Sequence, residues 1–394
     1  MTSSTSIHRG VWALAVTAFA IGVAEFIVVG ILPSIADGFK RSLAQVGGLV
    51  GLYAFALALG TPVIVLLSAR CSRKRLLLGL VALFLVGNLV SAVANSYALL
   101  LAGRLVTAVA HGSFFAIGAT VAARLAPPGQ ASRAIALMFA GLTLAMVIGV
   151  PLGSFIGNHF WWRLPFYAVA LLAAVALASV ARWVPDLPAK FVSAPKEALA
   201  TFTQLPILAM MSATILGFGS SFAAFTFITP ILVDITGFSS SMASVLLVVF
   251  GSATLVGNLL GGALSARWGW ATALRRLLIG LLIVLIALAM AMPYRTPMVI
   301  VLFLWGVLAF GMSPGFQAGM LETAERWAPR AVDFASALNI SAFNLGIALG
   351  ETLGSLLVAH NHMDMTPWIG LLLVALAQLP LAWLAFQHQQ LARA

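Results

Sequence analysis

The sequence of 394 residues contains few charged residues and a single cysteine. Asp, Glu, Lys and Arg together make up 8% of the chain, whereas apolar residues make up 62%. A water-soluble domain of this length needs far more charge to cover its surface. The lone Cys71 excludes an internal disulfide. The scarcity of charge therefore excludes a soluble globular protein and indicates a chain that lies within a lipid bilayer.

The apolar residues occur in runs of about 20 residues, long enough to cross a hydrocarbon core of roughly 30 Å as an α-helix. We expect twelve spans, at 11–35, 44–67, 76–95, 98–122, 133–156, 164–184, 204–231, 242–265, 274–293, 297–320, 334–359 and 366–387. The sequence therefore predicts an all-α membrane protein with twelve transmembrane helices.

The Lys and Arg residues lie mainly in the short segments between these runs. With the N-terminus in the cytoplasm, 16 of the 21 fall in cytoplasmic segments and four in outside loops. Cytoplasmic loops carry the excess of Lys and Arg in membrane proteins, so we expect both termini on the cytoplasmic side. The basic residues form no continuous face, so the net charge of +11 does not predict a nucleic-acid partner.

A four-residue pattern occurs twice, as Leu67–Arg70 and as Leu264–Arg267. The offset, 267 − 70 = 197, is half the chain length. The same offset aligns residues of rare types, in the pairs Pro33 and Pro230, Asp37 and Asp234, and Arg133 and Arg330. Six spans in each half give both halves the same orientation, as in transporters built from parallel repeats around a midplane site. We expect an N-terminal six-helix bundle (1–184), a cytoplasmic linker (185–203) and a C-terminal six-helix bundle (204–394).

The polar candidates Glu25, Arg104 and His111 lie inside predicted spans of the first half. Glu25 is near the middle of the first span, where a carboxylate costs about 2.5–3.5 kcal/mol unless it is neutralised or paired. A carboxyl that gains and loses a proton as water access changes could couple transport to protons; a permanently neutral or paired structural Glu is the alternative. Arg104 needs a carboxylate such as Glu25, a cavity, or a backbone carbonyl network. His111 shares a helix face with Arg104 and either lines a cavity or packs.

Other candidates for substrate contact lie in both halves. Glu351 could recognise substrate or carry a second proton, and Asn344 either lines a cavity or hydrogen-bonds between helices. The aromatic candidates for an apolar cavity wall are Tyr53, Phe114, Phe222 and Phe225. Aromatic residues in such spans also pack or face lipid. No second His or Cys stands at metal-ligand spacing, so we expect no metal site.

The fifth span contains closely spaced small residues, Gly141, Gly149 and Gly153, together with Pro151. Small residues four apart allow close helix approach, and Pro151 removes one internal hydrogen bond and permits a bend. The segment is either a pivot between the halves or a site of tight packing, and these two interpretations are compatible.

These features resemble the major facilitator superfamily. The segment Leu264–Gly269, preceded by Gly262, is similar to the Gly-x-Leu-Ala-Asp-Arg-x-Gly loop signature of that family, and Arg70–Lys74 resembles a first copy. Ala69 and Ala266 stand where that signature has Asp, so neither loop carries the aspartate of its charge relay. The resemblance implies that the basic loop residues latch neighbouring helices in one conformation; they are Arg70, Arg73, Lys74 and Arg267.

Arg104 and the stretch Gly141–Gly153 also resemble the family's span 4 and span 5 motifs, the latter associated with antiporters. Ala24–Phe26, His111–Phe115 and Asn339–Gly346 look like the arabinose-efflux-permease type of drug:proton antiporter. The resemblance implies proton-driven export of small molecules such as sugars, nucleosides or drugs. We expect a monomer in the bacterial inner membrane.

We therefore expect a secondary transporter driven by a proton gradient, with no cofactor and no enzymatic activity. Proton-coupled import is the nearest alternative. A channel would need a continuous polar pore, and a membrane receptor would be expected to carry a sizeable soluble domain; neither feature is visible. No nucleophile–base or metal constellation indicates an enzyme.

Overall fold

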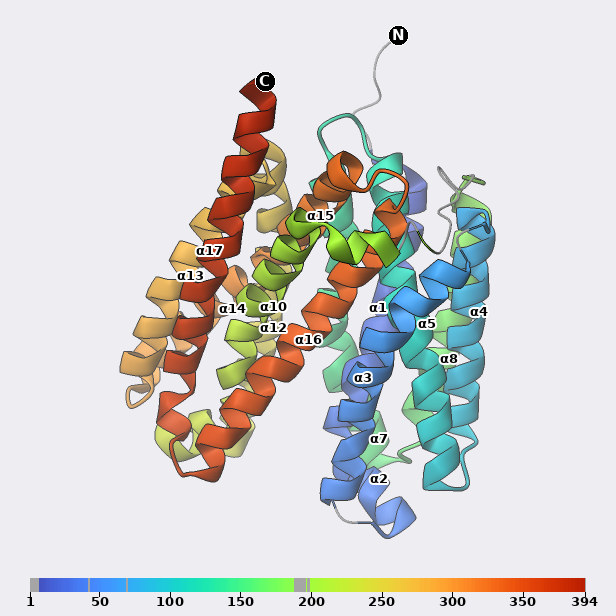
Figure 1. Cartoon of the computed structure of the whole chain (residues 1–394). Helices are drawn as coiled ribbons and strands as arrows, with labels where there is room; N and C mark the ends of the chain where they lie inside the picture. The colour runs from blue at the N-terminus through green and yellow to red at the C-terminus, as the bar shows by residue number, and fades with distance from the viewer. Residues whose placement is uncertain (1–6, 42, 69, 188–195, 197–198, 394) are drawn as a thin grey trace. The chain divides into compact units, whose positions relative to one another are not determined.

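The computed structural model describes the chain except residues 1–6, 42, 69, 188–195, 197–198 and 394. Its described residues form helices and turns and contain no strand (Figure 1). Twelve helical segments of this described part are long and apolar enough to cross a membrane. The predicted all-α, twelve-span architecture is therefore confirmed.

The chain divides into two compact units. Unit 1 contains Met1–Ala198 and Arg330–Ser341, and unit 2 contains Leu199–Pro329 and Ala342–Ala394. The predicted linker 185–203 lies largely outside the described residues, so the predicted bundle boundaries stay a prediction.

The helical segments of unit 1 follow one another with short connections. They are α1 (Arg9–Gly30), α2 (Leu32–Phe39), α3 (Leu43–Leu67), α4 (Arg73–Ala92), α5 (Tyr97–Leu125), α6 (Ala131–Leu144), the π-helical turn η1 (Ala145–Gly149), α7 (Val150–His159) and α8 (Leu164–Trp183). Within this unit α1 packs on α6 and α8, and α5 packs on α3 and α4.

Unit 2 repeats this order of spans. Its segments are η2 (Ala200–Thr203), α10 (Leu205–Phe225), α11 (Ile228–Pro230), η3 (Ile231–Ile235), α12 (Ser240–Trp268), α13 (Trp270–Ala291), α14 (Arg295–Gly311), α15 (Ser313–Trp327), most of α16 (Val332–Ala359), η4 (Met363–Met365) and α17 (Thr366–Arg393). Here α10 packs on α17 and α12 packs on α14.

Several predicted spans consist of more than one helical segment, and proline marks the breaks. Pro33, Pro151 and Pro314 stand in the first turn of α2, α7 and α15. Proline has no N–H and is tolerated at the first helical turn, where that donor is free anyway. Directly before Pro151, where the sequence predicts that a bend is possible, the helix contains the π-helical turn η1.

Glycines bring the fifth span against the first within unit 1. A Cβ added at Gly141 would meet the carbonyl oxygen of Ala15, and one added at Gly153 would meet the side chain of Ile27. The close helix approach predicted from the small-residue spacing is therefore present. In unit 2 a Cβ added at Gly350 of α16 would meet the backbone of Gly219 in α10, so a glycine also brings these two helices close together.

Candidate functional site

Glu25 lies in α1, five residues before the helix ends at Gly30. Its side chain is 19% exposed, whereas the neighbouring Ala24 is fully buried. The carboxylate atom Oε2 lies 4.0 Å from Nε2 of His111, which α5 contributes. The structure thus brings together an acid and an imidazole that are 86 residues apart in the sequence.

The imidazole of His111 makes a second polar contact through its other nitrogen. Nδ1 lies 2.9 Å from the hydroxyl oxygen of Tyr53 in α3, and both side chains are buried. Phe115 also contacts the imidazole, with ring centroids 5.1 Å apart. Tyr53, His111 and Glu25 therefore lie next to one another across α3, α5 and α1.

Arg104 completes this cluster from α5, two turns before His111. Its Nη1 donates a 2.7 Å hydrogen bond to the carbonyl oxygen of Ala24, and its guanidinium lies 4.1 Å above the ring of Tyr53. The side chain is 1% exposed, and its Nε has no hydrogen-bond acceptor among the described residues. Arg104 thus contacts the residue before Glu25, and a carbonyl is its acceptor in this arrangement.

The cluster in unit 1 is bounded by aromatic side chains of α5 and α6. Phe114 is buried and packs edge-on against Phe115 at 5.7 Å, and Phe115 in turn packs on Phe139. Phe115 rather than Phe114 therefore lies against the imidazole. The sequence did not separate these two neighbours, and the role of Phe114 as a substrate contact stays a prediction.

The predicted aromatic candidates of unit 2 lie at the end of α10. The rings of Phe222 and Phe225 are 5.7 Å apart, and Phe225 stacks on Phe250 of α12 at 4.7 Å. Trp305 of α14 packs on Phe250 at 5.3 Å and donates from Nε1 to Oγ of Ser221. We did not select Phe250 or Trp305 from the sequence, although the 197-residue offset from Tyr53 leads directly to Phe250.

The remaining polar candidates of unit 2 lie on α16. Asn344 is half-buried and Glu351 is exposed. Their roles as substrate contacts stay predictions.

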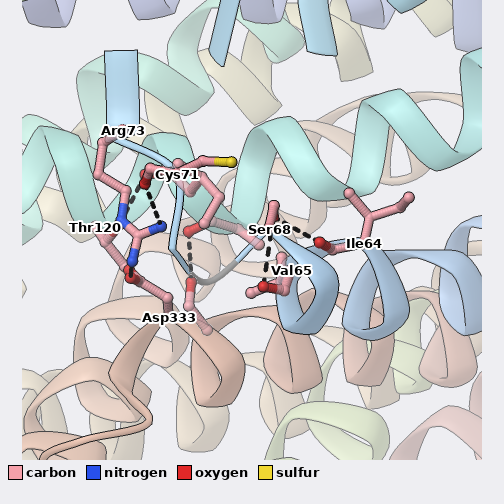
Figure 2. Close-up of polar contacts among 10 residues, drawn as sticks. Ile64, Val65, Ser68, Cys71, Arg73, Thr120 and Asp333 are labelled. Carbon is pink, nitrogen blue, oxygen red and sulfur yellow. Dashed lines mark hydrogen bonds and ion pairs between the residues drawn. The ribbon is translucent and has the colours of Figure 1, made fainter. Parts of the chain in front are cut away.

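A buried arginine forms an ion pair at the start of α4, directly after the basic loop that follows α3. Arg73 begins α4, is 2% exposed, and pairs through its guanidinium with the carboxylate of Asp333, in the first turn of α16 (Figure 2). The Arg73 guanidinium also donates to the carbonyl of Cys71, and its backbone N–H donates to the carbonyl of Leu187 at 2.9 Å. Asp333 belongs to the segment of α16 that is part of unit 1.

Asp333 was missed in the sequence, although it is one of only ten acidic residues and directly follows a basic loop segment. Arg70 and Arg267 are exposed and Lys74 is half-buried. Ala69, the position of the absent motif aspartate, lies outside the described residues. In the described part of the loop, Arg73 has its carboxylate partner in α16 rather than within the loop.

No group of three or more His, Cys, Asp or Glu side chains that could hold a metal occurs among the described residues. The chemistry of the cluster in unit 1 is that of one carboxyl, one imidazole, one phenol and one guanidinium. These groups can bind protons and donate or accept hydrogen bonds.

Comparison with known proteins identifies the class. A model of the Major Facilitator Superfamily matches residues 14–326. The chain is 41% identical over 372 residues to the "Uncharacterized MFS-type transporter YtbD" of Bacillus subtilis (strain 168), with 94% of each chain covered. It is 34% identical over 378 residues to the "Inner membrane transport protein YdhP" of Escherichia coli (strain K12), with 95% of each covered.

The fold agrees with solved transporters of the same superfamily. The structure of the transporter FucP in the outward conformation superposes with a TM-score of 0.77, covering 95% of this chain and 98% of that chain, at 15% identity. At this identity the likeness concerns the fold alone. The chain belongs to the Major Facilitator Superfamily and is a multi-pass membrane transporter.

Proposed function

We propose that the protein is a proton-coupled secondary transporter that exports a small organic solute, such as a sugar, a nucleoside or a drug, in exchange for protons. Glu25 is the group that carries the proton in this proposal, and Arg104 is its functional partner. The halves expose the transport site alternately to the two sides of the membrane, and no cofactor besides the proton gradient is required.

The single observation that supports this proposal is the cluster of Glu25, His111, Tyr53 and Arg104 within α1, α3 and α5. Ionisable groups inside membrane spans are costly and typically mark ion or substrate pathways. The carboxyl of Glu25 is partly exposed, while Tyr53, Arg104 and His111 are buried. A carboxyl at such a position can exchange a proton with water when the site is open, and the groups around it can respond to its charge.

We place the protein in the bacterial inner membrane, with both termini in the cytoplasm. The printed name of the relative YdhP includes the inner membrane. The distribution of Lys and Arg between the spans supports the orientation of the termini.

Transport in inverted membrane vesicles tests the proposal. Vesicles that contain the protein are acidified inside by respiration and followed with an acridine dye, and L-arabinose, inosine or ethidium is added outside. We expect at least one of these probes to release protons and restore the fluorescence. Glu25→Gln should abolish this response but leave exchange of the same labelled probe across de-energised vesicles.

Glu322→Gln is the matched control, because it removes a carboxylate whose side chain is 51% exposed on α15. It should respond like the wild type. Full gradient-driven transport by Glu25→Gln would contradict the role of Glu25. Probe uptake that falls, rather than rises, when the vesicle interior is acidified would favour the alternative of proton-coupled import.

A further inference from the structure

The contact between Tyr53 and His111 restricts how protons are arranged in the cluster. A tyrosine hydroxyl has one proton to donate, and a neutral imidazole has one N–H and one acceptor nitrogen. The 2.9 Å contact between Tyr53 Oη and His111 Nδ1 therefore has two possible arrangements. Either Tyr53 donates and the imidazole proton is on Nε2, or Nδ1 donates and Nε2 is bare.

Two neighbouring charges favour the first arrangement. The guanidinium of Arg104 lies 4.1 Å above the ring of Tyr53, and a positive charge at that place makes the phenol a stronger donor. On the far side of the imidazole, Nε2 lies 4.0 Å from the carboxylate oxygen of Glu25, which favours a proton on Nε2. Both effects place the N–H of His111 on the side of Glu25.

We propose that His111 is a positioning residue for Glu25: Tyr53 holds the neutral imidazole with its proton on Nε2, and this N–H stabilises the deprotonated carboxylate. The inference rests on the proposed role of Glu25 as the proton-carrying group. The 4.0 Å separation is longer than a hydrogen bond. The last side-chain torsion of Glu25 has a broad energy minimum, and we expect it to turn so that the carboxylate approaches Nε2 when the carboxyl loses its proton.

This assignment differs from a role of His111 in substrate contact. Nδ1 of the imidazole contacts the hydroxyl of Tyr53, and Nε2 faces the carboxylate of Glu25. Both nitrogens are therefore directed at residues of the cluster rather than at a substrate. Among the described residues, the titratable side chains next to His111 are Tyr53 from α3 and Glu25 from α1. The charged Arg104 of α5 lies over the ring of Tyr53 and donates to the carbonyl of Ala24, the residue before Glu25. His111 therefore links the hydroxyl of α3 to the carboxyl of α1.

Nitrogen NMR of the purified protein in nanodiscs tests the tautomer without any transported solute. The protein is labelled with ¹⁵N-histidine, and the signals of His111 are identified by their loss in His111→Gln. We expect one protonated nitrogen, Nε2, and one unprotonated nitrogen, Nδ1. Tyr53→Phe should lose this single-tautomer pattern, because it removes the hydroxyl that contacts Nδ1. The aromatic ring stays in place, so packing around the imidazole is kept.

Tyr167→Phe is the matched control, since it removes the hydroxyl of a tyrosine that is 38% exposed on α8. It should leave the His111 signals unchanged. A wild-type His111 that is protonated on Nδ1, or a pattern that survives Tyr53→Phe, overturns the inference.

The ¹³C carboxyl signal of Glu25, identified by its loss in Glu25→Gln, provides the second readout. At one fixed near-neutral pH, we expect a larger protonated fraction of Glu25 in His111→Leu than in the wild type. His111→Gln, whose amide N–H can donate to Glu25, should lie between them. An unchanged fraction in His111→Leu overturns the inference. Neither readout involves transport, so full transport by Glu25→Gln contradicts the proposed function separately from any NMR result.

Discussion

The two units place opposite chemistry on corresponding helices. In α1, α3 and α5 of unit 1 the cluster positions carry groups that ionise or hydrogen-bond: Glu25, Tyr53, Arg104 and His111. The residues 197 positions later, in α10, α12 and α14 of unit 2, are apolar: Phe222, Phe250, Val301 and Leu308. The repeat therefore preserves the helices while the side chains between them have diverged.

The basic loops differ in the same way. Arg73 of unit 1 pairs with Asp333, whereas the residue 197 positions later is Trp270, whose ring packs edge-on against His388 at 5.2 Å. Both residues are buried at the start of the helix that follows the loop. Charged contacts in unit 1 thus correspond to aromatic contacts in unit 2. At these positions the ionisable side chains therefore lie in unit 1.

Replacing Arg104 with valine, the residue found 197 positions later in unit 2, should have the largest effect on transport. Arg104→Val removes a hydrogen bond from a charged donor, about 1.5–3 kcal/mol, and a buried cation–π contact, about 2 kcal/mol. If these contacts act during transport, gradient-driven transport should fall at least about a hundredfold. The vesicle assay with the responding probe measures this loss.

Arg163→Val is the control for Arg104→Val. Arg163 also donates to a backbone carbonyl, that of Ala94 at 2.7 Å, and its guanidinium lies over the ring of Trp162; neither contact involves the cluster around Glu25. A purely structural role of Arg104 predicts equal transport by the two variants at equal protein level. Equal transport would mean that Arg104 in unit 1 has no transport role that its counterpart Val301 in unit 2 lacks.

Breaking the Arg73–Asp333 pair should lower the free energy of unfolding by about 3 kcal/mol in Arg73→Ala. Loss of one partner of a buried pair costs about 3–5 kcal/mol, and the lower end applies because Asp333 is 23% exposed. Thermal denaturation in detergent measures the loss. The labelling rate of Cys71, the only cysteine, should also change because Arg73 contacts its carbonyl.

Arg267→Ala in the second loop is the matched control for that pair. Arg267 is exposed. Its replacement should change the unfolding free energy by no more than about 0.5 kcal/mol. Equal destabilisation by the two variants would show that the two loops contribute alike and that the Asp333 pair is not a stabilising contact.

The spans could be predicted because hydropathy alone determines whether a helix crosses a bilayer. The shared face of Arg104 and His111 also follows from sequence, since they are seven residues apart on one helix. The contact between Tyr53 and His111 does not, because it depends on how α3 is placed along α5. Both helices carry apolar side chains around most of their circumference, so the hydrophobic pattern contains no information about that placement.

The partner of Arg73 could not be predicted for a related reason. A charge at the start of an apolar run is typical of a span boundary, and Asp333 stands one residue after α16 begins. Its pairing joins residues 260 positions apart in the sequence, across helices whose order in space hydropathy does not determine. The absent motif aspartate indicated that the usual relay is missing, but only the structure identifies the carboxylate that Arg73 uses.

The smallest expected difference concerns glycines that the repeat aligns. A Cβ at Gly350 would meet the backbone oxygen of Gly219, which cannot move away, whereas a Cβ at Gly153 would meet the flexible end of Ile27. Overpacking costs about 1–3 kcal/mol, so Gly350→Ala should destabilise by about 2 kcal/mol and Gly153→Ala by about 1 kcal/mol or less. Gly79→Ala, where a Cβ meets nothing within 4 Å, should stabilise by up to about 1 kcal/mol. Thermal denaturation that ranks Gly153→Ala below Gly350→Ala in stability would contradict the difference in packing between the two units.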